Sequence, residues 1–348
     1  MLDSIYRDFA VEQATKLLSI DSPSGYTEKA AQWVLEAFQA LGCEAHITTK
    51  GGVLACLGGE DAEHALMLEA HTDTLGGMVA QIKPDGRLRI TALGGMQAQN
   101  GEAENVRVYT RDGRVYEGTL QLINASVHVN GDYAKTQRSF DTTEVVLDED
   151  VKTRTDVEKL GIMNGDIVCF DPRTHVTASG YIKSRFLDDK LSVGILLGLA
   201  KYIHDTGIVP QRRVYAHITV YEEVGHGGAA SLPQGVTDAI SVDMGCVGDD
   251  LTCRETQVSI CAKDSAGPYD FDFTNELVAR AQRLGLDYAV DVYPRYSSDT
   301  ATALRAGLDA RFALCGQGVF ASHGYERTHV RGLMNTLALV EDVATMNM

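Results

Sequence analysis

The N-terminal part of the chain alternates between helical and extended hydrophobic patterns. Apolar side chains recur every three to four residues over 4–19, and again over 28–41, where Gly42 ends the pattern. The stretch 44–59 contains two short apolar runs, and 64–73 is an apolar run that ends in polar residues. Short continuous apolar runs are typical of buried strands. Helices alternating with buried strands predict an α/β layered domain.

The pattern changes over residues 77–177. Polar and apolar side chains alternate in "VAQIKPDGRLRIT" and in "NVRVYTRDGRVYEGTLQLIN", and the turn sequences KPDG and TRDG interrupt them. A period of two residues predicts strands joined by tight turns. The helical pattern is absent from this part of the sequence. We therefore expect an inserted β-rich domain over 77–177, either a small barrel or a sandwich.

The α/β pattern resumes at residue 178. Predicted strands and helices again follow one another, with strands at 212–225, 238–245 and 310–318 and helices at 187–207, 273–285, 299–307 and 327–346. The segments 1–76 and 178–348 should together form one α/β domain. The β-rich segment would then project from this domain.

Composition and charge limit the classes of binding partner and the cellular compartment that we expect for this protein. The 348 residues include 48 acidic and 31 basic side chains, for a net charge of −17, which argues against nucleic acid or an anionic membrane as a partner. The seven cysteines form no C-x-x-C pair, which favours free thiols in a reducing compartment and hence the cytoplasm. The sequence shows no signal-peptide pattern and no apolar run of 18 residues, so we expect no membrane span.

Polar side chains stand at the ends of the predicted strands. The run "LMLEAHTD" ends in His71 and Asp73, "ITVYEE" ends in Glu222 and Glu223, and "AISVD" ends in Asp243. In open α/β sheets, ligands bind outside the carboxyl ends of the strands, so these side chains should meet in one crevice. If the strand continued through both glutamates, their side chains would point to opposite faces.

Two further side chains lie away from the strands. Asp188 opens a helix in "FLDDKLSVG", where an aspartate is more often only an N-cap, and His323 lies in the loop "ASHGYER". Each residue taken alone suggests a structural role. Together, histidines and carboxylates form the ligand set that binds zinc, cobalt or manganese. Asp73 is well placed to accept the second ring N–H of His71, and one carboxylate remains to act as a base toward water.

The order of these motifs resembles one family. "HTD", "LDDK", "EEVG" followed by "GGA", "VDMG" and "SHGYE" occur in the order found in the co-catalytic metallo-aminopeptidases of family 42, some of which have been described as endoglucanases. The resemblance covers essentially the whole chain and includes the β-rich insertion. It implies a mixed-sheet α/β aminopeptidase domain with an inserted small barrel-like domain. It also implies hydrolysis of the N-terminal residue of short peptides.

The resemblance assigns roles to the polar residues. It implies two divalent metal ions, zinc first and cobalt or manganese as alternatives, with five ligands: His71, Asp188, Glu223, Asp243 and His323. Asp188 corresponds to the ligand shared by both ions. Glu222 corresponds to the general base and Asp73 to the residue that orients His71. Periodicity alone would allow Glu222 and Glu223 to exchange roles.

Other functions and residues remain open at this point. A related metal-dependent amidohydrolase, such as a carboxypeptidase, a deacylase or a hydrolase of small amides, could use the same site. An endoglucanase would leave the histidines unexplained, and a non-catalytic binding protein would not need the complete ligand set. His226 could touch the substrate, while Arg254, Lys263 and Asp264 could line a specificity pocket. Departures from the family pattern near the expected substrate side, such as Thr74, prevent any transfer of specificity.

The β-rich insertion suggests self-association. Its alternating strands leave edges and apolar faces that need a cover. The resemblance implies that this domain forms dimers, which in relatives build a hollow dodecamer. We therefore expect a homo-oligomer, either a dimer or a dodecamer made from dimers.

Overall fold

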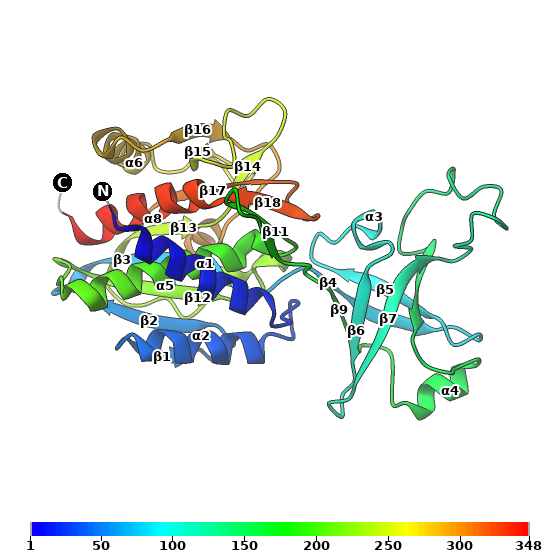
Figure 1. Ribbon diagram of the computed structural model, residues 1–348. Helices are drawn as coiled ribbons and strands as arrows, with labels where there is room; N and C mark the ends of the chain where they lie inside the picture. Colours follow the sequence, from blue (N-terminus) through cyan, green and yellow to red (C-terminus); the bar gives the residue numbers. More distant parts are fainter. Residues whose placement is uncertain (1, 347–348) are drawn as a thin grey trace. The chain divides into compact units, whose positions relative to one another are not determined.

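The chain divides into two units in the structure, a computed structural model that describes residues 2–346 (Figure 1). One unit comprises Met1–Asp73 with Arg173–Met348, and the other comprises Thr74–Pro172. The first contains a mixed twelve-stranded sheet with helices, and the second a closed six-stranded barrel. This architecture confirms the predicted α/β class and the barrel alternative for the insertion.

The sheet of the first unit is ordered β1-β2-β12-β3-β13-β17-β18-β11-β10, and β14, β15 and β16 pair outside this path. Its strands are β1 (Glu44–Ile47), β2 (Val53–Gly58), β3 (Asp61–His71), β10 (His175–Val176), β11 (Tyr181–Ser184), β12 (Arg212–Thr219), β13 (Val236–Val242), β14 (Gly245–Val247), β15 (Val258–Lys263), β16 (Tyr288–Val292), β17 (Arg311–Phe320) and β18 (Glu326–His329). The central strands β12, β3, β13 and β17 are parallel, so their carboxyl ends share one edge.

Helices cover this sheet, as Figure 1 shows for α1, α5 and α8. The helices of the unit are α1 (Ser4–Leu18), α2 (Glu28–Ala40), α5 (Leu187–Thr206), α6 (Phe271–Leu284), α7 (Asp299–Arg305) and α8 (Val330–Thr345). Two short 3-10 turns, η1 (Glu222–Val224) and η2 (Gly227–Ala229), follow β12. Within residues 2–346, no helix is both long and apolar enough to cross a membrane.

Helix α5 forms the centre of the packing. Leu191, Ile195 and Leu199 are fully buried, and burying each such side chain contributes about 1.5–3 kcal/mol. Helix α1 crosses α5 very closely at Gly194, where an added Cβ would lie 2.6 Å from the carbonyl oxygen of Ala10. A larger residue at this position would push the two helices apart. This contact fixes α5 against α1.

The barrel of the second unit closes in the order β4-β5-β8-β7-β6-β9. Its elements are β4 (Gly76–Ile82), β5 (Leu88–Leu93), α3 (Ala98–Gly101), β6 (Asn105–Tyr109), β7 (Val115–Leu122), β8 (Thr143–Leu147), α4 (Arg154–Lys159) and β9 (Ile167–Phe170). The two short helices were not expected. Helix α4 begins with a capping box between Thr153 and Asp156, a signal that is easily overlooked when only one and a half turns follow.

Two predicted boundaries are wrong. Strand β12 ends at Thr219, whereas the sequence pattern extends it through the two glutamates. The closing helix begins at Val330, because the preceding residues 326–329 form strand β18. That strand pairs with β11, more than 140 residues earlier in the chain, so its register depends on a partner that local periodicity does not reveal.

Candidate metal centre

The carboxyl ends of β3 and β13 bring two polar side chains to the same edge of the sheet. Strand β3 ends at His71, and Asp243 directly follows the last residue of β13. Both side chains are buried, with 1% and 5% of their surface exposed. The backbone N–H of Met244 donates to Asp243 at 2.6 Å, which fixes one of the two carboxylate oxygens. The strand-end prediction for His71 and Asp243 therefore agrees with their placement.

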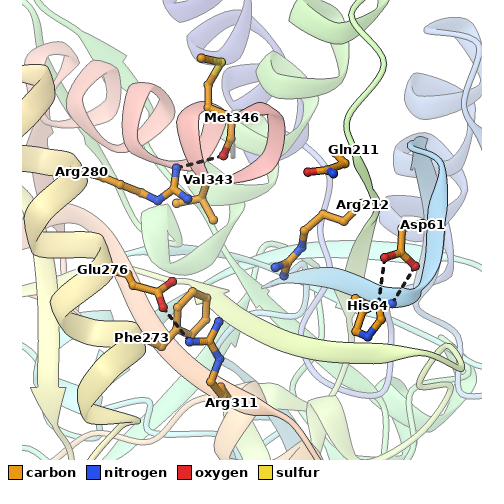
Figure 2. A pocket seen from close by; sticks show the side chains of 10 residues that line it. All are labelled: Asp61, His64, Gln211, Arg212, Phe273, Glu276, Arg280, Arg311, Val343 and Met346. Carbon is orange, nitrogen blue, oxygen red and sulfur yellow. Dashed lines mark hydrogen bonds and ion pairs between the residues drawn. The ribbon is translucent and has the colours of Figure 1, made fainter. Parts of the chain in front are cut away.

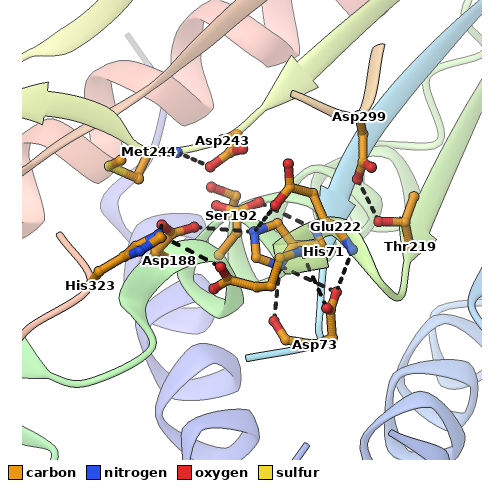
Figure 3. A network of polar contacts seen from close by, with 12 residues as sticks. His71, Asp73, Asp188, Ser192, Thr219, Glu222, Asp243, Met244, Asp299 and His323 are labelled. Carbon is orange, nitrogen blue, oxygen red and sulfur yellow. Dashed lines mark hydrogen bonds and ion pairs between the residues drawn. The ribbon is translucent and has the colours of Figure 1, made fainter. Parts of the chain in front are cut away.

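Asp188 lies between two histidines at the start of α5 (Figure 3). Its Oδ1 is 3.1 Å from Nε2 of His71, and its Oδ2 is 3.5 Å from Nε2 of His323. The backbone of Asp188 is not helical, with φ −74° and ψ 102°, and its carboxylate contacts the two histidines. Both Asp188 and His323 donate their backbone N–H groups to the carboxylate of Glu326, at 3.1 and 3.0 Å. Glu326 thus places these two residues relative to each other.

Two groups of potential ligand atoms share Asp188. One group contains His71, Asp188 and Asp243, and the other contains Asp188, Glu223 and His323. The ligand atoms of each group lie within 4.8 Å of one another. Nε2 of His323 is 3.6 Å from Oε2 of Glu223. The structure therefore brings all five sequence-predicted ligands together around one shared carboxylate.

The two adjacent glutamates are placed by a turn rather than by a strand. After β12 ends, Tyr221 adopts a left-handed conformation with φ 71°, and the 3-10 turn η1 begins at Glu222. The expectation that strand alternation separates the two side chains is therefore wrong. The turn separates them instead, because Oε2 of Glu222 lies 3.7 Å from His71, whereas Glu223 reaches His323.

Asp73 contacts His71 differently from the sequence prediction. Nδ1 of His71 lies 2.9 Å from the backbone carbonyl oxygen of Asp73 and 3.6 Å from its carboxylate. The carboxylate is directed elsewhere, because it accepts the hydroxyl of Ser24 at 2.5 Å and the backbone N–H groups of Glu222 and Glu223 at 3.1 and 3.4 Å. Asp73 therefore orients the imidazole through its main chain and the glutamate turn through its side chain.

The clustered carboxylates strongly affect one another's protonation. Burial raises the pKa of Glu222 and of Glu223 well above the usual range, and nearby carboxylates add to the effect. Burial together with Asp188 raises the pKa of Asp243 to about 7. A hydrogen bond to Asp188 raises the pKa of His323 to about 9. Burial is thus the main cause for the carboxyl groups, with repulsion between neighbouring carboxylates added to it, whereas His323 is shifted by its acidic partner.

The residues present fit a pair of divalent cations. Within residues 2–346, Oε1 of Glu223 is buried and has no hydrogen-bond partner, so it offers a free lone pair inside the cluster. Histidine nitrogens with carboxylate oxygens are the mixed ligand set that zinc, cobalt and manganese accept. Bound cations would also supply the positive charge that four neighbouring carboxylates lack.

Several supporting residues escaped the sequence prediction. Glu326 lies in the motif "SHGYE", only three residues after His323, and this spacing was the available signal. Asp299 begins α7, where an acidic residue is the expected start of a helix and attracts no attention. Lys50 lies in the hairpin turn between β1 and β2, and no local pattern links it to the site.

The remaining candidates are less closely tied to the ligand cluster. The ring of His226 stacks on Tyr221, with centroids 5.0 Å apart. Lys263 donates to the backbone carbonyl of Asp264, whose carboxylate accepts the hydroxyl of Tyr269 at 2.7 Å. A specificity role for Lys263, Asp264 and Arg254 stays a prediction.

The pocket in Figure 2 lies at the opposite edge of the sheet. It has a volume of about 580 Å³, and its lining includes Asp61, Arg212 and Arg311, the first residues of β3, β12 and β17. Because these strands are parallel, their first residues lie away from the ligand cluster. Asp238 joins Arg212 and Arg311 through ion pairs of 2.6 and 2.7 Å, so this edge is held by charge pairing.

Comparisons of the sequence identify related proteins. The sequence model of the M42 glutamyl aminopeptidases matches residues 51–339. YhfE of Bacillus subtilis, itself provisionally assigned as an aminopeptidase, is 41% identical over 330 residues, which is 95% of each chain. A lysyl aminopeptidase of Pyrococcus furiosus is 23% identical over 234 residues, covering 67% of this chain and 65% of that protein.

Comparisons of the structure identify the same fold. The aminopeptidase APDkam598 of Desulfurococcus kamchatkensis superposes with a TM-score of 0.87 at 23% identity, covering 98% of this chain and 96% of that one. The TET1 peptidase of Pyrococcus horikoshii, which can assemble into a tetrahedron or a large octahedral shell, has a TM-score of 0.84 at 20% identity, with 97% and 100% covered. The matches extend over both units of the chain.

Proposed function

Because the chain belongs to the M42 glutamyl aminopeptidase family and is therefore a hydrolase of the aminopeptidase type, we propose that it removes N-terminal residues from short peptides with two divalent metal ions and Glu222 as general base. One observation carries this proposal. Two ligand groups share Asp188, and Glu222 belongs to neither group although its carboxylate lies 3.7 Å from His71. A carboxylate that is close to the ions without being needed as a ligand is free to accept a proton.

Each ion would be held by residues of this chain. His71, Asp188 and Asp243 would hold one, and Asp188, Glu223 and His323 would hold the other, with Asp188 bridging. When bound, the two cations supply Lewis acidity that polarises the scissile carbonyl and makes water more acidic. Zinc is the first choice for this ligand set, and cobalt and manganese also fit it.

Glu222 would transfer the proton during hydrolysis. Its carboxylate accepts a proton from the attacking water and then donates that proton to the leaving amine, so that the group returns to its starting state. Asp73 keeps the turn of Glu222 in place through the backbone N–H at 3.1 Å.

We also propose that the protein is a homo-oligomer assembled through the barrel unit. The long connection between β7 and β8 exposes Val127 and Val129, with 63% and 78% of their surface accessible. Neighbouring exposed apolar side chains often mark an interaction surface. The TET1 peptidase, which shares the fold, can assemble into closed shells, and this supports a dimer or a larger assembly made from dimers.

A substrate panel on metal-depleted protein tests the proposal. Free-amine amino-acid anilides, the same anilides with an acetylated α-amino group, and short peptides would be assayed after adding zinc, cobalt or manganese separately. Hydrolysis should require metal, and should occur only with a free α-amino group. Cleavage of the acetylated anilides at an equal rate would favour a related amidohydrolase. Full activity after exhaustive chelation would contradict the proposed metal dependence.

A further inference from the structure

The segment Thr219–Ala229, which we call the glutamate segment, carries both Glu222 and Glu223 but has little regular structure of its own. It contains two 3-10 turns of three residues each. Tyr221 adopts a left-handed conformation, which is unfavourable for a residue with a side chain. A strained backbone persists only where its surroundings hold it in place. The contacts that hold this segment therefore decide where the two glutamates point.

Asp299 contacts the glutamate segment near both of its ends. One carboxylate oxygen of Asp299 accepts the hydroxyl of Thr219 at 2.5 Å, and the other accepts the backbone N–H of Gly228 at 2.6 Å. Figure 3 shows the contact with Thr219 on the side of Glu222 that faces away from Asp188. Asp299 itself is fixed, because it is 3% exposed and lies in the first turn of α7.

Two glycines allow this close contact. A Cβ on Gly227 would lie 2.1 Å from Oδ1 of Asp299, and a Cβ on Gly228 would lie 2.4 Å from its backbone carbonyl oxygen. Real Cβ atoms do not approach other atoms so closely, so any side chain at either position would push the segment away from Asp299. The sequence "GHGG" is thus matched to the position of this aspartate.

Lys50 holds the same segment from another side. Its ammonium group donates to the backbone carbonyl oxygens of His226 and Gly227. The hairpin turn that carries Lys50 packs tightly on the end of β12, since a Cβ on Gly52 would lie 2.5 Å from the carbonyl oxygen of Ile218. Burial lowers the pKa of the Lys50 ammonium group, and the carboxylates of Asp299, Asp73 and Glu69 oppose this shift.

We propose that Asp299 and Lys50 are positioning residues for the aminopeptidase reaction, which clamp the glutamate segment so that Glu222 and Glu223 reach the metal centre. This inference rests on the proposed function for its catalytic consequence. Asp299 accepts the hydroxyl of Thr219 and the backbone N–H of Gly228, and Lys50 donates to backbone carbonyl oxygens, so neither needs to touch substrate. Asp73 holds the middle of the segment at Glu222, while Asp299 and Lys50 hold its ends.

Matched variants of the metal-loaded full chain test the clamp. D299A removes both acceptors, D299N retains one carbonyl oxygen for Gly228, and K50M removes the donor while keeping much of the side-chain length. The control is D238N. Asp238 is as buried as Asp299, but it forms an ion pair with Arg212 at the opposite edge of the sheet. The measurements are kcat and KM on an aminoacyl anilide, metal content per subunit, and amide hydrogen exchange of peptides covering 219–229.

The clamp predicts a specific combination of results. D299A should lower kcat about 100-fold and D299N and K50M about 10-fold, with KM changed less than about threefold, since a displacement near 1 Å can cost a factor of this size. Hydrogen exchange should accelerate in the peptides covering 219–229 and not in α5 or β3. D238N should lower the melting temperature and leave both kcat and exchange in the segment unchanged.

Three other outcomes would each overturn a defined claim. If the wild-type chain cleaves no anilide or peptide with any metal, the proposed function fails, and the exchange data still show whether Asp299 holds the segment. If the wild type is active and D299A retains its kcat, Asp299 is not a positioning residue. If D299A and D238N accelerate exchange throughout the protein to the same extent, the role of Asp299 is general stability rather than positioning.

Discussion

The carboxylate of Asp73 accepts the backbone N–H of Glu222 at 3.1 Å, so an aspartate that follows one strand fixes the turn that follows the neighbouring strand. The same carboxylate accepts the N–H of Glu223 at 3.4 Å. Both glutamates are thereby linked to Asp73, a residue that also contacts His71 through its backbone carbonyl oxygen. Because β3 and β12 are adjacent and parallel, this link spans only one strand spacing.

Replacing Asp73 by alanine should impair catalysis more than metal binding. D73A leaves two backbone N–H groups without their acceptor, so Glu222 loses its fixed position, and we expect kcat to fall about 100-fold. All five proposed ligands remain. S24A is the matched comparison, because it removes only the hydroxyl that donates to Asp73 and should cost much less. Equal losses in the two variants would contradict the role assigned to the carboxylate.

Replacing Glu222 by glutamine should separate metal binding from chemistry. The amide has nearly the same size and cannot accept a proton from water, so kcat should fall by about 10²–10⁴-fold. Because Glu222 belongs to neither ligand group, the variant should still hold two ions per subunit, measured by elemental analysis. A variant that remains active would show that another residue is the base. Loss of an ion would show that Glu222 is itself a ligand.

The sequence could predict which side chains meet in this cluster because each stands where an element changes character. The apolar run before His71 and the one before Asp243 end at buried strand termini, and the parallel order of β3 and β13 makes them neighbours. The position of the glutamates could not be derived in this way. Apolar residues continue through Tyr221, so the sequence pattern extends the strand. In the structure, the next two backbone N–H groups donate to the carboxylate of Asp73, which lies in a distant part of the chain, and the strand therefore does not continue.

The shared position of Asp188 predicts how many metal ions each ligand variant binds per subunit. Asp188 belongs to both ligand groups, whereas His71 belongs to one and His323 to the other. H71A and H323A should therefore each retain about one tightly bound ion per subunit, because only one group loses a ligand. D188A should retain none at the same free metal concentration. Isothermal titration of metal-depleted protein measures these values, and an H323A variant that holds two ions would contradict the assignment.

The exposed valines of the barrel unit predict that charged side chains at their positions will weaken the proposed oligomer. Val127 and Val129 lie in the connection between β7 and β8, and carboxylates at both positions would place charge on the proposed contact surface. The wild type should elute as an oligomer in light-scattering chromatography, and V127D/V129D should yield smaller species. A matched change on the other unit is V209D, since Val209 is as exposed as Val127, at 63%. If both variants behave alike, these two valines are not part of the contact surface.

The buried thiols predict a loss of stability in alkali. Burial raises the pKa of Cys253, Cys261 and Cys315 from 9.0 to about 12. Below pH 9 these thiols are protonated in both the folded and the unfolded chain, so their contribution to stability is fully present. Between pH 9 and 12 the unfolded chain releases these protons and the folded chain keeps them, so the free energy of unfolding falls as the pH rises.

Each of these thiols can lower the free energy of unfolding by up to about 1.4 kcal/mol per pH unit, or roughly 4 kcal/mol per pH unit for the three together. Urea unfolding at pH 8, 9.5 and 10.5 measures this slope. C315A is the informative variant, because burial alone causes the shift at Cys315. It should be less stable than the wild type at pH 8, since a small cavity remains, and its slope above pH 9 should be shallower by up to about 1.4 kcal/mol per pH unit. An unchanged slope would mean that Cys315 loses its proton as easily in the folded chain as in the unfolded one.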